Sequence, residues 1–443
     1  MRAPAAGEGI GAAVRRLEDA RYLLGGARYV ADISLPGEVC CVLVRSPHAH
    51  AVIRMIDVEP ALACPGVVAA FTGADMAADN VGPMRAFWVI RSADGRPMAE
   101  PPRFALARER VRHVGEPVVA VIAETLHAAM DAAESVVVDY ALLPAVIESR
   151  AALDAGAPEL HANAPGNICF RWERGDATAV ERAFAAAAHA TTLDLVNNRL
   201  VGAAIEPRAI LAAPEPATGR MTVYDSTQTP HHVRRFLAEE LGLTESDLRL
   251  IAPDVGGGFG YKGKHYPEET IVAWAARRLR RPVKWVATRA ESFLADNQAR
   301  DHLTRAALAL DTDGRFLAVR VETVANLGAY VSTFGAAIPS AIYSSLLAGP
   351  YRTPAIHVTV TGAFTNTLPT DAYRGAGRPE ACYLLERLAD RAARDLNIDR
   401  AEIRRRNLIP AAAMPYKTPI GPTYDSGDFP AVLEGALGLA DYR

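Results

Sequence analysis

Three features that would mark particular classes of protein are scarce or absent in this 443-residue sequence. Only five cysteines are present and none forms a Cys-x-x-Cys pair, so we expect no disulfide scaffold, iron–sulfur cluster or cysteine-rich zinc site in this chain. The 48 Lys and Arg are balanced by 51 Asp and Glu, which gives no basic excess for nucleic acid or a membrane surface. No apolar run reaches the roughly 18 residues of a membrane span, and the N-terminus lacks a signal-peptide core. These absences predict a cytoplasmic protein.

The residues that are present fit a globular α/β enzyme. Hydrophobic residues make up 50% of the chain and charged residues 22%, which is enough apolar material for a buried core. The length suits two or three domains. Changes of pattern divide the chain into a flexible tail (1–10), a first domain (11–150), a connecting arm (151–175) and a second domain (176–443). The mixture of short strands and helices predicts a mixed α/β, or α+β, fold.

In the first domain, short apolar runs predict mainly strands. A helix is expected over 126–136, and a long surface loop over 75–105, which carries Gly, Pro, Asp and Asn without a period. We expect strands at 29–35, 39–46, 49–58, 65–73, 116–125 and 136–140. The apolar face predicted for the helix consists of Leu126, Ala129, Met130 and Ala133.

The second domain shows longer strands and more regular amphipathic helices. Helices are expected over 177–190, 231–243, 268–279, 381–396 and 401–408. Strands are expected over 191–200, 219–230 where the strand runs into a loop, 248–255, 282–288, 303–310, 316–330 and 356–365. The helix over 231–243 has one clear apolar face, formed by Val233, Phe236, Leu237 and Leu241.

The strongest local signal for a binding site is DVGGGFGYKGK, residues 254–264. Four glycines in five positions expose backbone N–H groups that can hold phosphate or pterin heteroatoms. The simpler alternative is a tight turn between a strand and a helix. Two nucleotide templates also nearly fit. The run from Gly258 to Gly263 matches a dinucleotide fingerprint, and the run from Gly258 to Lys264 matches most of a phosphate-binding loop, with His265 in place of Ser or Thr.

Two further segments carry polar groups that suit a ligand. In DAYRGAGRPE, Arg374 and Arg378 can bind an anion in a glycine-rich loop before a helix, or they can be solvated or paired with Glu380. In STQTP, Gln228 can donate a hydrogen bond into a pocket, although such a residue more often caps a helix or faces water. The segment IEPR, which contains Glu206, is interpreted as structural.

Together, these motifs resemble the molybdenum hydroxylases, the family of xanthine dehydrogenase and carbon monoxide dehydrogenase. STQTP, DVGGGFGYKG and DAYRGAGRPEACYLLERLAD follow the order and spacing of the family's molybdopterin-binding large subunit, and EPRA and TYDSGD fit as well. RRLEDARYLLGGARYVADI and SPHAHAVI resemble its N-terminal hammerhead domain. The resemblance covers nearly the whole chain. It implies an α/β hammerhead domain followed by the first half of a molybdopterin-binding domain.

The resemblance also implies a role for each motif. Gln228 would hydrogen-bond the apical oxo ligand of molybdenum, and the loop at Arg374 would close the active site beside the metal. The family hydroxylates its substrates with oxygen derived from water, and its proteins contribute positioning, proton transfer and electrostatics. No side chain of this chain is predicted as a direct metal ligand. Gln228 and Arg374 are assigned catalytic roles, and the predicted cofactor contacts are Gln228, Gly256, Gly257, Gly258, Phe259, Gly260, Arg374 and Gly375.

Departures from the family pattern narrow the range of expected substrates. Carbon monoxide dehydrogenases carry a copper-binding Cys where Gly375 stands here, so no soft ligand for Cu(I) is offered. Purine-oxidising members have a Glu at the position of Gly263, an Arg near Ile342 and a stacking Phe at Ala376. Their absence predicts a roomier, less polar pocket for an aldehyde, an N-heterocycle or another aromatic.

The family's subunit continues well beyond the motifs found here. Its second half carries the catalytic Glu in a Gly-x-Gly-Glu segment that this chain lacks, so we expect either a second chain that supplies this half or a fragment. The resemblance implies molybdopterin, in its cytosine dinucleotide form, and electron transfer to partner chains with [2Fe–2S] clusters and FAD. Two alternatives stay open, a non-catalytic cofactor-binding or scaffold module and a nucleotide-binding enzyme that uses the Gly258–Lys264 loop.

Overall fold

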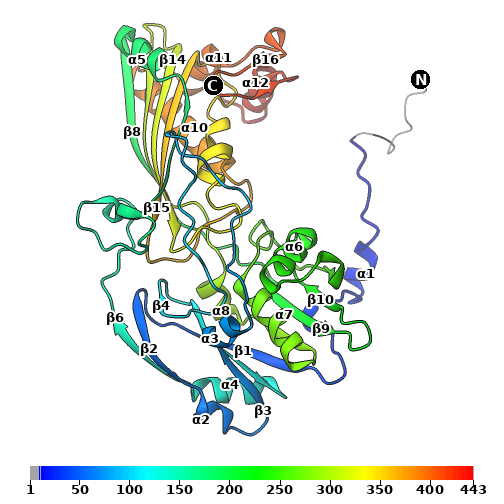
Figure 1. Cartoon of the computed structure of the whole chain (residues 1–443). Coiled ribbons are helices and arrows are strands. Elements are labelled where there is room, and N and C mark those ends of the chain that lie inside the picture. The colour runs from blue at the N-terminus through cyan, green and yellow to red at the C-terminus, as the bar shows by residue number, and fades with distance from the viewer. Residues whose placement is uncertain (1–8, 10, 443) are drawn as a thin grey trace.

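The computed structural model describes residues 9 and 11–442 and shows a lower and an upper lobe (Figure 1). The flexible tail predicted at 1–10 lies outside the described residues, apart from residue 9. The lower lobe contains the N-terminal strands together with residues 209–286, and the upper lobe is built on a long five-stranded sheet. In the part of the chain that the structure describes, no helix combines the length and the apolar character needed to cross a membrane.

A seven-stranded sheet in the lower lobe contains strands from both predicted domains. Its order is β11-β10-β9-β12-β1-β5-β3. β1 pairs in parallel with β12, with Val39 opposite Val283, so segments far apart in the sequence share one sheet. They also share one hydrophobic core. The strands are β1 (Val39–Arg45), β3 (Val67–Thr72), β5 (Pro117–Ala123), β9 (Ala209–Pro214), β10 (Met221–Asp225), β11 (Leu248–Ile251) and β12 (Val283–Val286).

Two amphipathic helices, each beginning with a proline, follow the loops at one edge of this sheet. Proline suits the first turn of a helix because the missing N–H has no intrahelical partner there. α6 (Pro230–Leu241) buries the four apolar residues that the sequence predicted. α7 (Pro267–Leu279) is buried over most of its length because it packs against both α6 and β9. α8 (Arg289–Ala295) follows β12.

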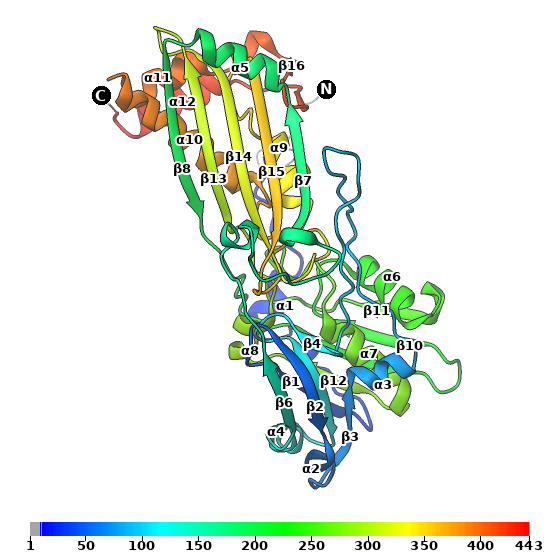
Figure 2. The same cartoon turned by 60° about the vertical axis from the view of Figure 1, so that its left-hand side comes forward.

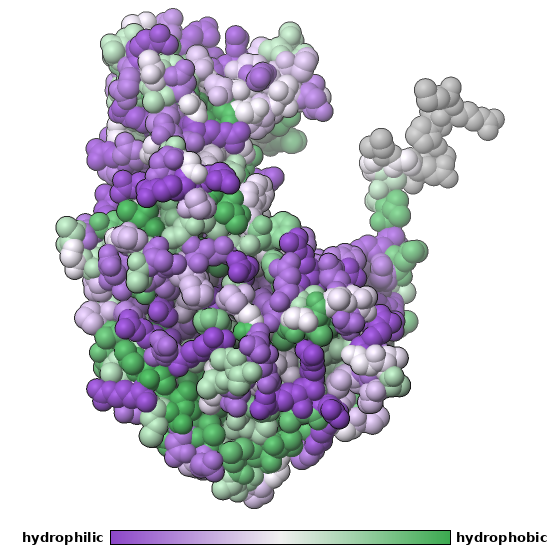
Figure 3. All heavy atoms as spheres, viewed as in Figure 1, coloured by the Kyte–Doolittle hydropathy of each residue, from purple (hydrophilic) through white to green (hydrophobic). Residues whose placement is uncertain are grey.

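A three-stranded sheet and short helices complete the N-terminal part. α4 buries Ala129 and Ala132, whereas Leu126 and Met130 are 49% and 46% exposed, so the predicted apolar face is wrong. Alanine allows α4 to approach β1 closely, and the larger side chains are left outside. Figure 3 shows apolar side chains gathered at the lower end of the molecule. The elements are α1 (Asp19–Leu23), β2 (Ala51–Asp57), α2 (Glu59–Leu62), α3 (Gly73–Ala78), β4 (Arg110–Val111), α4 (Leu126–Glu134) and β6 (Val137–Leu142), with sheet order β4-β2-β6.

The upper lobe is a five-stranded sheet of order β7-β15-β14-β13-β8 (Figure 2). Side chains alternate along a strand: Leu308 and Leu310 of β13 pack into the core that contains α10, whereas Ala309 packs with α5. The two helices therefore cover opposite faces. The elements are β7 (Ile168–Gly175), α5 (Ala177–Ala186), β8 (His189–Asn197), β13 (His302–Leu310), β14 (Phe316–Gly328), α9 (Tyr343–Ser345), β15 (Ala355–Phe364), α10 (Arg378–Asp395), α11 (Arg400–Asn407), β16 (Tyr416–Lys417), β17 (Thr423–Tyr424) and α12 (Phe429–Leu439).

One prediction for the N-terminal part is wrong and one holds for most of its length. The strand expected at 29–35 is a short 3-10 helix, Val30–Asp32, followed by extended chain. The surface loop expected at 75–105 is irregular after α3 and partly exposed, and it also packs against the upper lobe, where the Ala99 N–H donates to the Cys169 carbonyl at 2.8 Å. Turn-forming residues mark a loop in the sequence, but they do not show that the loop docks on a distant part of the chain.

Candidate functional site

Three loops meet at one edge of the seven-stranded sheet. β10 and β11 are parallel neighbours, with Met221 opposite Leu248, so the chain leaves both strands at the same edge. The loop after β10 carries Gln228, and the loop after β11 is the glycine segment, residues 254–264. The third loop, residues 371–377, precedes α10 and is called the Arg374 loop below. In open α/β sheets, ligands bind at the carboxyl ends of the strands.

Gln228 occupies the space that a side chain at position 258 would need. A Cβ built on Gly258 would lie 2.5 Å from both Cδ and Oε1 of Gln228, so this close approach requires glycine. The Gly260 N–H donates to Gln228 Oε1 at 2.8 Å, and the Gln228 N–H donates to the Lys262 carbonyl at 2.9 Å. Because Oε1 acts as an acceptor here, Gln228 keeps both Nε2 hydrogens as donors.

The Arg374 loop packs against the glycine segment. The Arg374 N–H donates to the Phe259 carbonyl at 2.8 Å. Gly375 adopts a φ of +98°, and a Cβ there would lie 2.6 Å from Pro379 Cδ in the first turn of α10. The structure thus brings together the three segments that contain every residue proposed from the sequence for cofactor contact.

A set of unused hydrogen-bond donors lies where these loops meet. No acceptor among the described residues is bonded to the N–H groups of Gly257, Gly258 and Phe259. Gly257 and Phe259 have φ angles of +98° and +50°, and such alternation around Gly258 makes a concave nest of N–H groups. The Arg374 guanidinium is exposed and, within the described chain, pairs with no carboxylate. These N–H groups, Gln228 Nε2 and the Arg374 side chain form what we call the donor cradle.

Glu206, which the sequence analysis interpreted as structural, supports the glycine segment directly. Its Oε2 accepts from the Gly256 N–H and from Lys262 Nζ, both at 2.6 Å. Its Oε1 is buried and has no partner among the described residues. Burial lowers the pKa of Lys262, and the Glu206 carboxylate opposes this effect. One carboxylate therefore holds both halves of the segment.

The two lysines of the glycine segment do not face a phosphate site. Lys262 is paired with Glu206, and Lys264 is buried with its Nζ 3.8 Å from Asp371 Oδ1. Burial lowers the pKa of Lys264 to about 8, although Asp371 acts in the opposite direction. α7 begins only at Pro267. The structure argues against the nucleotide-loop interpretation, because that loop needs a lysine free to reach the phosphates.

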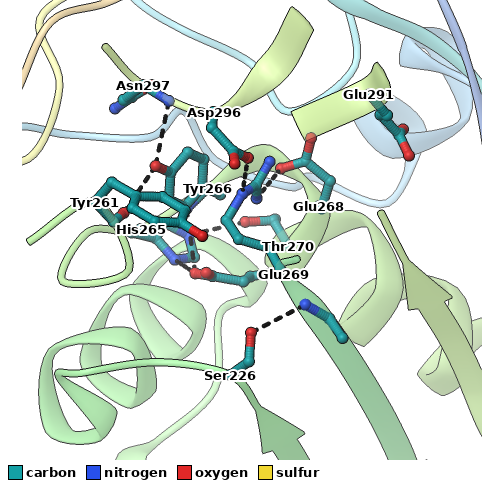
Figure 4. A network of polar contacts seen from close by, with 12 residues as sticks. Ser226, Tyr261, His265, Tyr266, Glu268, Glu269, Thr270, Glu291, Asp296 and Asn297 are labelled. Atoms are coloured by element: carbon teal, nitrogen blue, oxygen red, sulfur yellow. Dashed lines mark hydrogen bonds and ion pairs between the residues drawn. The ribbon is translucent and has the colours of Figure 1, made fainter. Parts of the chain in front are cut away.

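A network of buried charges joins β1 to α7 and to the residue before β9; Figure 4 shows two of its carboxylates, Glu268 and Asp296. Arg208 binds Glu268 at 2.8 Å and Asp296 at 2.6 Å, and the other oxygen of Glu268 binds Arg45 of β1 at 2.7 Å. The Arg208 guanidinium also lies 3.6 Å from the centre of the Tyr266 ring. Because breaking a buried pair leaves an uncompensated charge, this network fixes the parts of the lower lobe relative to one another.

His265 is a second buried charge in the same interior. Its Nδ1 lies 2.6 Å from Glu269 Oε2, and its Nε2 lies 3.1 Å from Glu240 Oε2 (Figure 4 shows His265 beside Glu269). Burial disfavours the charged ring, but the two carboxylates outweigh that effect and raise the pKa of His265 to about 10. In the sequence, His265 was notable only as a mismatch to a phosphate-binding loop; Glu269 follows it at i,i+4, but Glu240 is 25 residues away and no spacing identifies it.

We expect the chain to lose stability as the pH rises from 7 to 8. The unfolded chain releases the His265 proton near pH 6.5, whereas the folded chain keeps it to about pH 10. The stability that the charged His265 contributes is therefore complete below pH 6.5 and is lost as the pH rises through about 10. Urea titrations should show a decrease of about 1 kcal/mol per pH unit in the free energy of unfolding. His265→Gln should flatten that slope, and an equal slope in the variant would contradict the assignment.

Arg300, which the sequence analysis did not single out, holds the Arg374 loop. Its Nη2 donates to the Arg374 carbonyl at 2.9 Å, and its Nη1 lies 3.0 Å from Glu380 Oε1 in the first turn of α10. Arg300 and Asp301 both adopt left-handed φ angles, +67° and +63°, which are unfavourable for non-glycine residues. The chain thus maintains a costly backbone conformation beside a buried ion pair that anchors the loop.

The fold and the matching family models define a molybdopterin-binding protein. Residues 160–408 match the family model of the molybdopterin cofactor-binding domain, and residues 24–144 match that of the a/b hammerhead domain of aldehyde oxidase and xanthine dehydrogenase. More particularly, the chain belongs to the molybdenum hydroxylase family of oxidoreductases and corresponds to the N-terminal portion of its molybdopterin-binding large subunit. The resemblance and the mixed α/β fold expected from the sequence are confirmed.

Individual relatives support the same assignment. The chain is 36% identical over 440 residues to the carbon monoxide dehydrogenase large chain of Hydrogenophaga pseudoflava, covering 96% of this chain and 53% of that protein. The crystal structure of quinoline 2-oxidoreductase from Pseudomonas putida 86 matches with a TM-score of 0.89 and 34% identity, over 97% of this chain and 54% of that one. The chain thus spans about half the length of these two proteins. The nicotinate dehydrogenase large molybdopterin subunit of Eubacterium barkeri is 28% identical over 96% of this chain and 92% of its own length.

The donor cradle fits a molybdopterin cofactor, which is a bulky, anionic, phosphate-bearing group. Backbone N–H groups without protein acceptors and an exposed guanidinium suit phosphate and pterin heteroatoms. The absence of a side chain at Gly258 lets the Gln228 amide lie directly against the backbone, beside these N–H groups. The residues present therefore meet the chemical needs of that group.

Proposed function

We propose that this chain holds the metal end of molybdopterin in an enzyme that oxidises an aldehyde, an N-heterocycle or another aromatic compound with oxygen from water. The observation that carries the proposal is the donor cradle. Three unpartnered N–H groups, at residues 257–259, lie beside an amide donor at Gln228 and a guanidinium at Arg374. When bound, the cofactor supplies the oxygen-transfer and two-electron chemistry.

The chain's own residues bind and orient this group. The N–H groups of Gly257, Gly258 and Phe259 donate to it, and Gln228 Nε2 donates toward its metal end. Oε1 of Gln228 stays on the Gly260 N–H, so the amide cannot rotate without losing a hydrogen bond. Arg374 places a positive charge at the rim. A fixed donor set of this kind stabilises developing negative charge without reorganising during the reaction.

The cofactor form and the partners are part of this proposal. We propose the cytosine dinucleotide form of molybdopterin, partner chains that carry [2Fe–2S] clusters and FAD, and a cytoplasmic enzyme. We further propose that a second chain supplies the half with the catalytic Glu. The Eubacterium barkeri protein supports the last point, because it is named a large molybdopterin subunit and matches this chain over 92% of its own length.

The surroundings of the Arg374 loop favour an aromatic substrate. Gly375 and Ala376 provide neither a thiolate for copper nor an aromatic ring. The segment Ile338–Ile342 packs beside this loop, because a Cβ on Gly377 would lie 3.2 Å from the Ile338 carbonyl oxygen. Two relatives are named for quinoline and nicotinate, which are both N-heteroaromatic compounds. We therefore place an N-heterocycle first among the three substrate classes.

Co-expression tests the proposed function. The chain would be produced together with a second chain that carries a Gly-x-Gly-Glu segment and with iron–sulfur and FAD subunits. We expect a complex with about one molybdenum per copy of this chain that oxidises quinoline or nicotinate and incorporates labelled oxygen from water. A complex that assembles without molybdenum would contradict the cofactor assignment. A complex that contains molybdenum but incorporates no water oxygen into any of the three substrate classes would contradict the activity.

Substitution of Gln228 should separate turnover from cofactor loading. Gln228→Ala is expected to lower kcat by roughly a hundredfold, because one fixed donor to the reacting centre is lost. Molybdenum content should change little, since the backbone donors remain. Gln228→Glu is the matched variant, because it keeps the acceptor for the Gly260 N–H while it replaces the Nε2 donors with an oxygen and adds a negative charge. Wild-type turnover in both variants would contradict the donor role.

Substitution of Arg300 should disturb the Arg374 loop. Arg300→Lys keeps the charge but cannot bond both the Arg374 carbonyl and Glu380 in the same geometry. We expect kcat to fall about tenfold, the size of one charge-assisted hydrogen bond, at normal molybdenum content. Arg404→Lys is the control, because Arg404 also combines an ion pair, to Glu386, with a carbonyl hydrogen bond, but lies in α11. Equal effects of the two variants would contradict the assignment.

A further inference from the structure

A cavity of about 270 Å³ lies between β4 and the chain just after β14, and no residue of the donor cradle lines it. Its wall includes Arg108, Arg110 and Arg112, which come from a single stretch of chain. Figure 2 shows β4 in the lower lobe, close to the loops that lead to the upper sheet. The aromatic side chains of Tyr330 and Phe104 also line the cavity.

The arginines near this cavity form no ion pair with a carboxylate of the described residues. Arg103, which does not line the cavity, is buried, and its guanidinium carbon lies 5.6 Å from the centre of the Tyr330 ring. Arg108 lies 3.5 Å from the centre of the Phe104 ring, and its Nε is buried without a hydrogen-bond partner. Among the described residues, no carboxylate forms an ion pair with Arg103, Arg108, Arg110 or Arg112.

The two carboxylates at the cavity cannot neutralise this charge. Glu116 Oε1 accepts from the Tyr330 hydroxyl at 2.8 Å, and its Oε2 accepts from the Arg112 backbone N–H at 2.6 Å. Glu109 is exposed at the rim. Three guanidinium groups line the cavity against two carboxylates, which leaves a surplus of one positive charge. Burial also lowers the pKa of Arg108, because its guanidinium is partly removed from solvent.

We propose that this cavity binds an oxyanion group, a phosphate or a carboxylate. Arg108 and Arg112 are half-buried, and a bound anion offsets part of the cost of removing these charges from water. Guanidinium groups bind such oxyanions through two parallel N–H donors. The Phe104 ring holds Arg108, and Arg112 Nη1 donates to the Tyr330 hydroxyl at 3.3 Å, so two of the three arginines are in place before the anion arrives. The anion is either a free small molecule or an acidic group of a partner chain.

Calorimetric titration of the full chain with inorganic phosphate at low salt tests the proposal. We expect saturable binding of about one phosphate per chain that weakens with added NaCl. Arg108→Gln and Arg110→Gln should each weaken binding about tenfold, which corresponds to the loss of one charge-assisted hydrogen bond. Arg110 is exposed, so its variant should fold even if the Arg108 variant does not. Arg249→Gln, at an exposed and unpaired arginine of β11, is the control and should bind normally.

Titration of the assembled enzyme and of the isolated chain distinguishes the two possible sources of the anion. If the assembled enzyme also binds phosphate in this cavity, the natural ligand is a free oxyanion. If only the isolated chain binds it, an acidic group of a partner chain occupies the site after assembly. Absence of saturable phosphate binding to the isolated chain would overturn the proposal, and so would binding that Arg110→Gln leaves unchanged. Neither result depends on molybdenum loading, so the proposed function is tested separately.

Discussion

Gly258→Val should abolish most cofactor loading in the assembled enzyme. A Cβ at this position would lie 2.5 Å from Gln228, so either the amide or the backbone of the glycine segment must move. Overpacking of this kind costs about 1–3 kcal/mol, and the cofactor would bind roughly ten- to a hundredfold more weakly. Molybdenum and pterin analysis of the purified complex measures the effect directly. Normal metal content would contradict the proposed approach of the backbone to the cofactor.

Two further variants show whether the collision is the cause. Gly435→Val is the control, because a Cβ on Gly435 in α12 would meet no atom within 4 Å, and it should load normally. In the double variant Gly258→Ala with Gln228→Ala, the atoms that collide with the new Cβ are removed. We expect the double variant to recover molybdenum content relative to Gly258→Ala alone, although its turnover should stay low. No recovery would mean that the collision with Gln228 is not what blocks loading.

Arg208→Met should destabilise the chain by about 3–5 kcal/mol, as expected when one partner of a buried ion pair is removed. Arg208 binds both Glu268 and Asp296 in the interior, and methionine would leave Asp296 without a cation. The loss of the contact with the Tyr266 ring adds to the effect. Urea denaturation monitored by circular dichroism would show a lower midpoint with an unchanged slope.

The matched control for Arg208 is an exposed pair. Arg234 lies 2.7 Å from Glu245, with both side chains well exposed. Arg234→Met should change the free energy of unfolding by less than about 1 kcal/mol, because solvent screens the pair and side-chain entropy opposes it. Similar losses for Arg208→Met and Arg234→Met would show that the buried network does not stabilise the lower lobe.

The sequence predicts the local elements of this fold better than their assembly. The predicted apolar face of α6 is confirmed. Its apolar residues recur with a regular helical period, because one side of the helix is buried and the other faces solvent. The predicted apolar face of α4 is wrong, because alanine favours a helix but does not indicate which side of that helix is buried. The pairing of Val39 with Val283 carries no local signal at all. β9 was missed because EPRAILAAP is short and lies between prolines.

The site, like the fold, could be predicted where the signal is local and not where it depends on distant contacts. Gln228 and the glycine segment could be found from residue types and spacing, because their chemistry depends on a bare backbone and one amide. Arg300 and Glu206 act through contacts with residues distant in the chain, as does His265 through Glu240, and neither composition nor period reveals such contacts. The domain boundaries and the catalytic roles proposed from the sequence stay predictions.

Hydrogen exchange of the glycine segment is the most direct test of the central claim, that this bare main chain holds the cofactor. In the unloaded complex, the N–H groups of residues 257–259 have no protein acceptor and should exchange rapidly. Loading with the cofactor should slow exchange in peptides that cover 255–260 and 372–377 by about tenfold or more, whereas a peptide within β13 should not change. Unchanged exchange at 255–260 in a complex that contains a full complement of molybdenum would contradict the account.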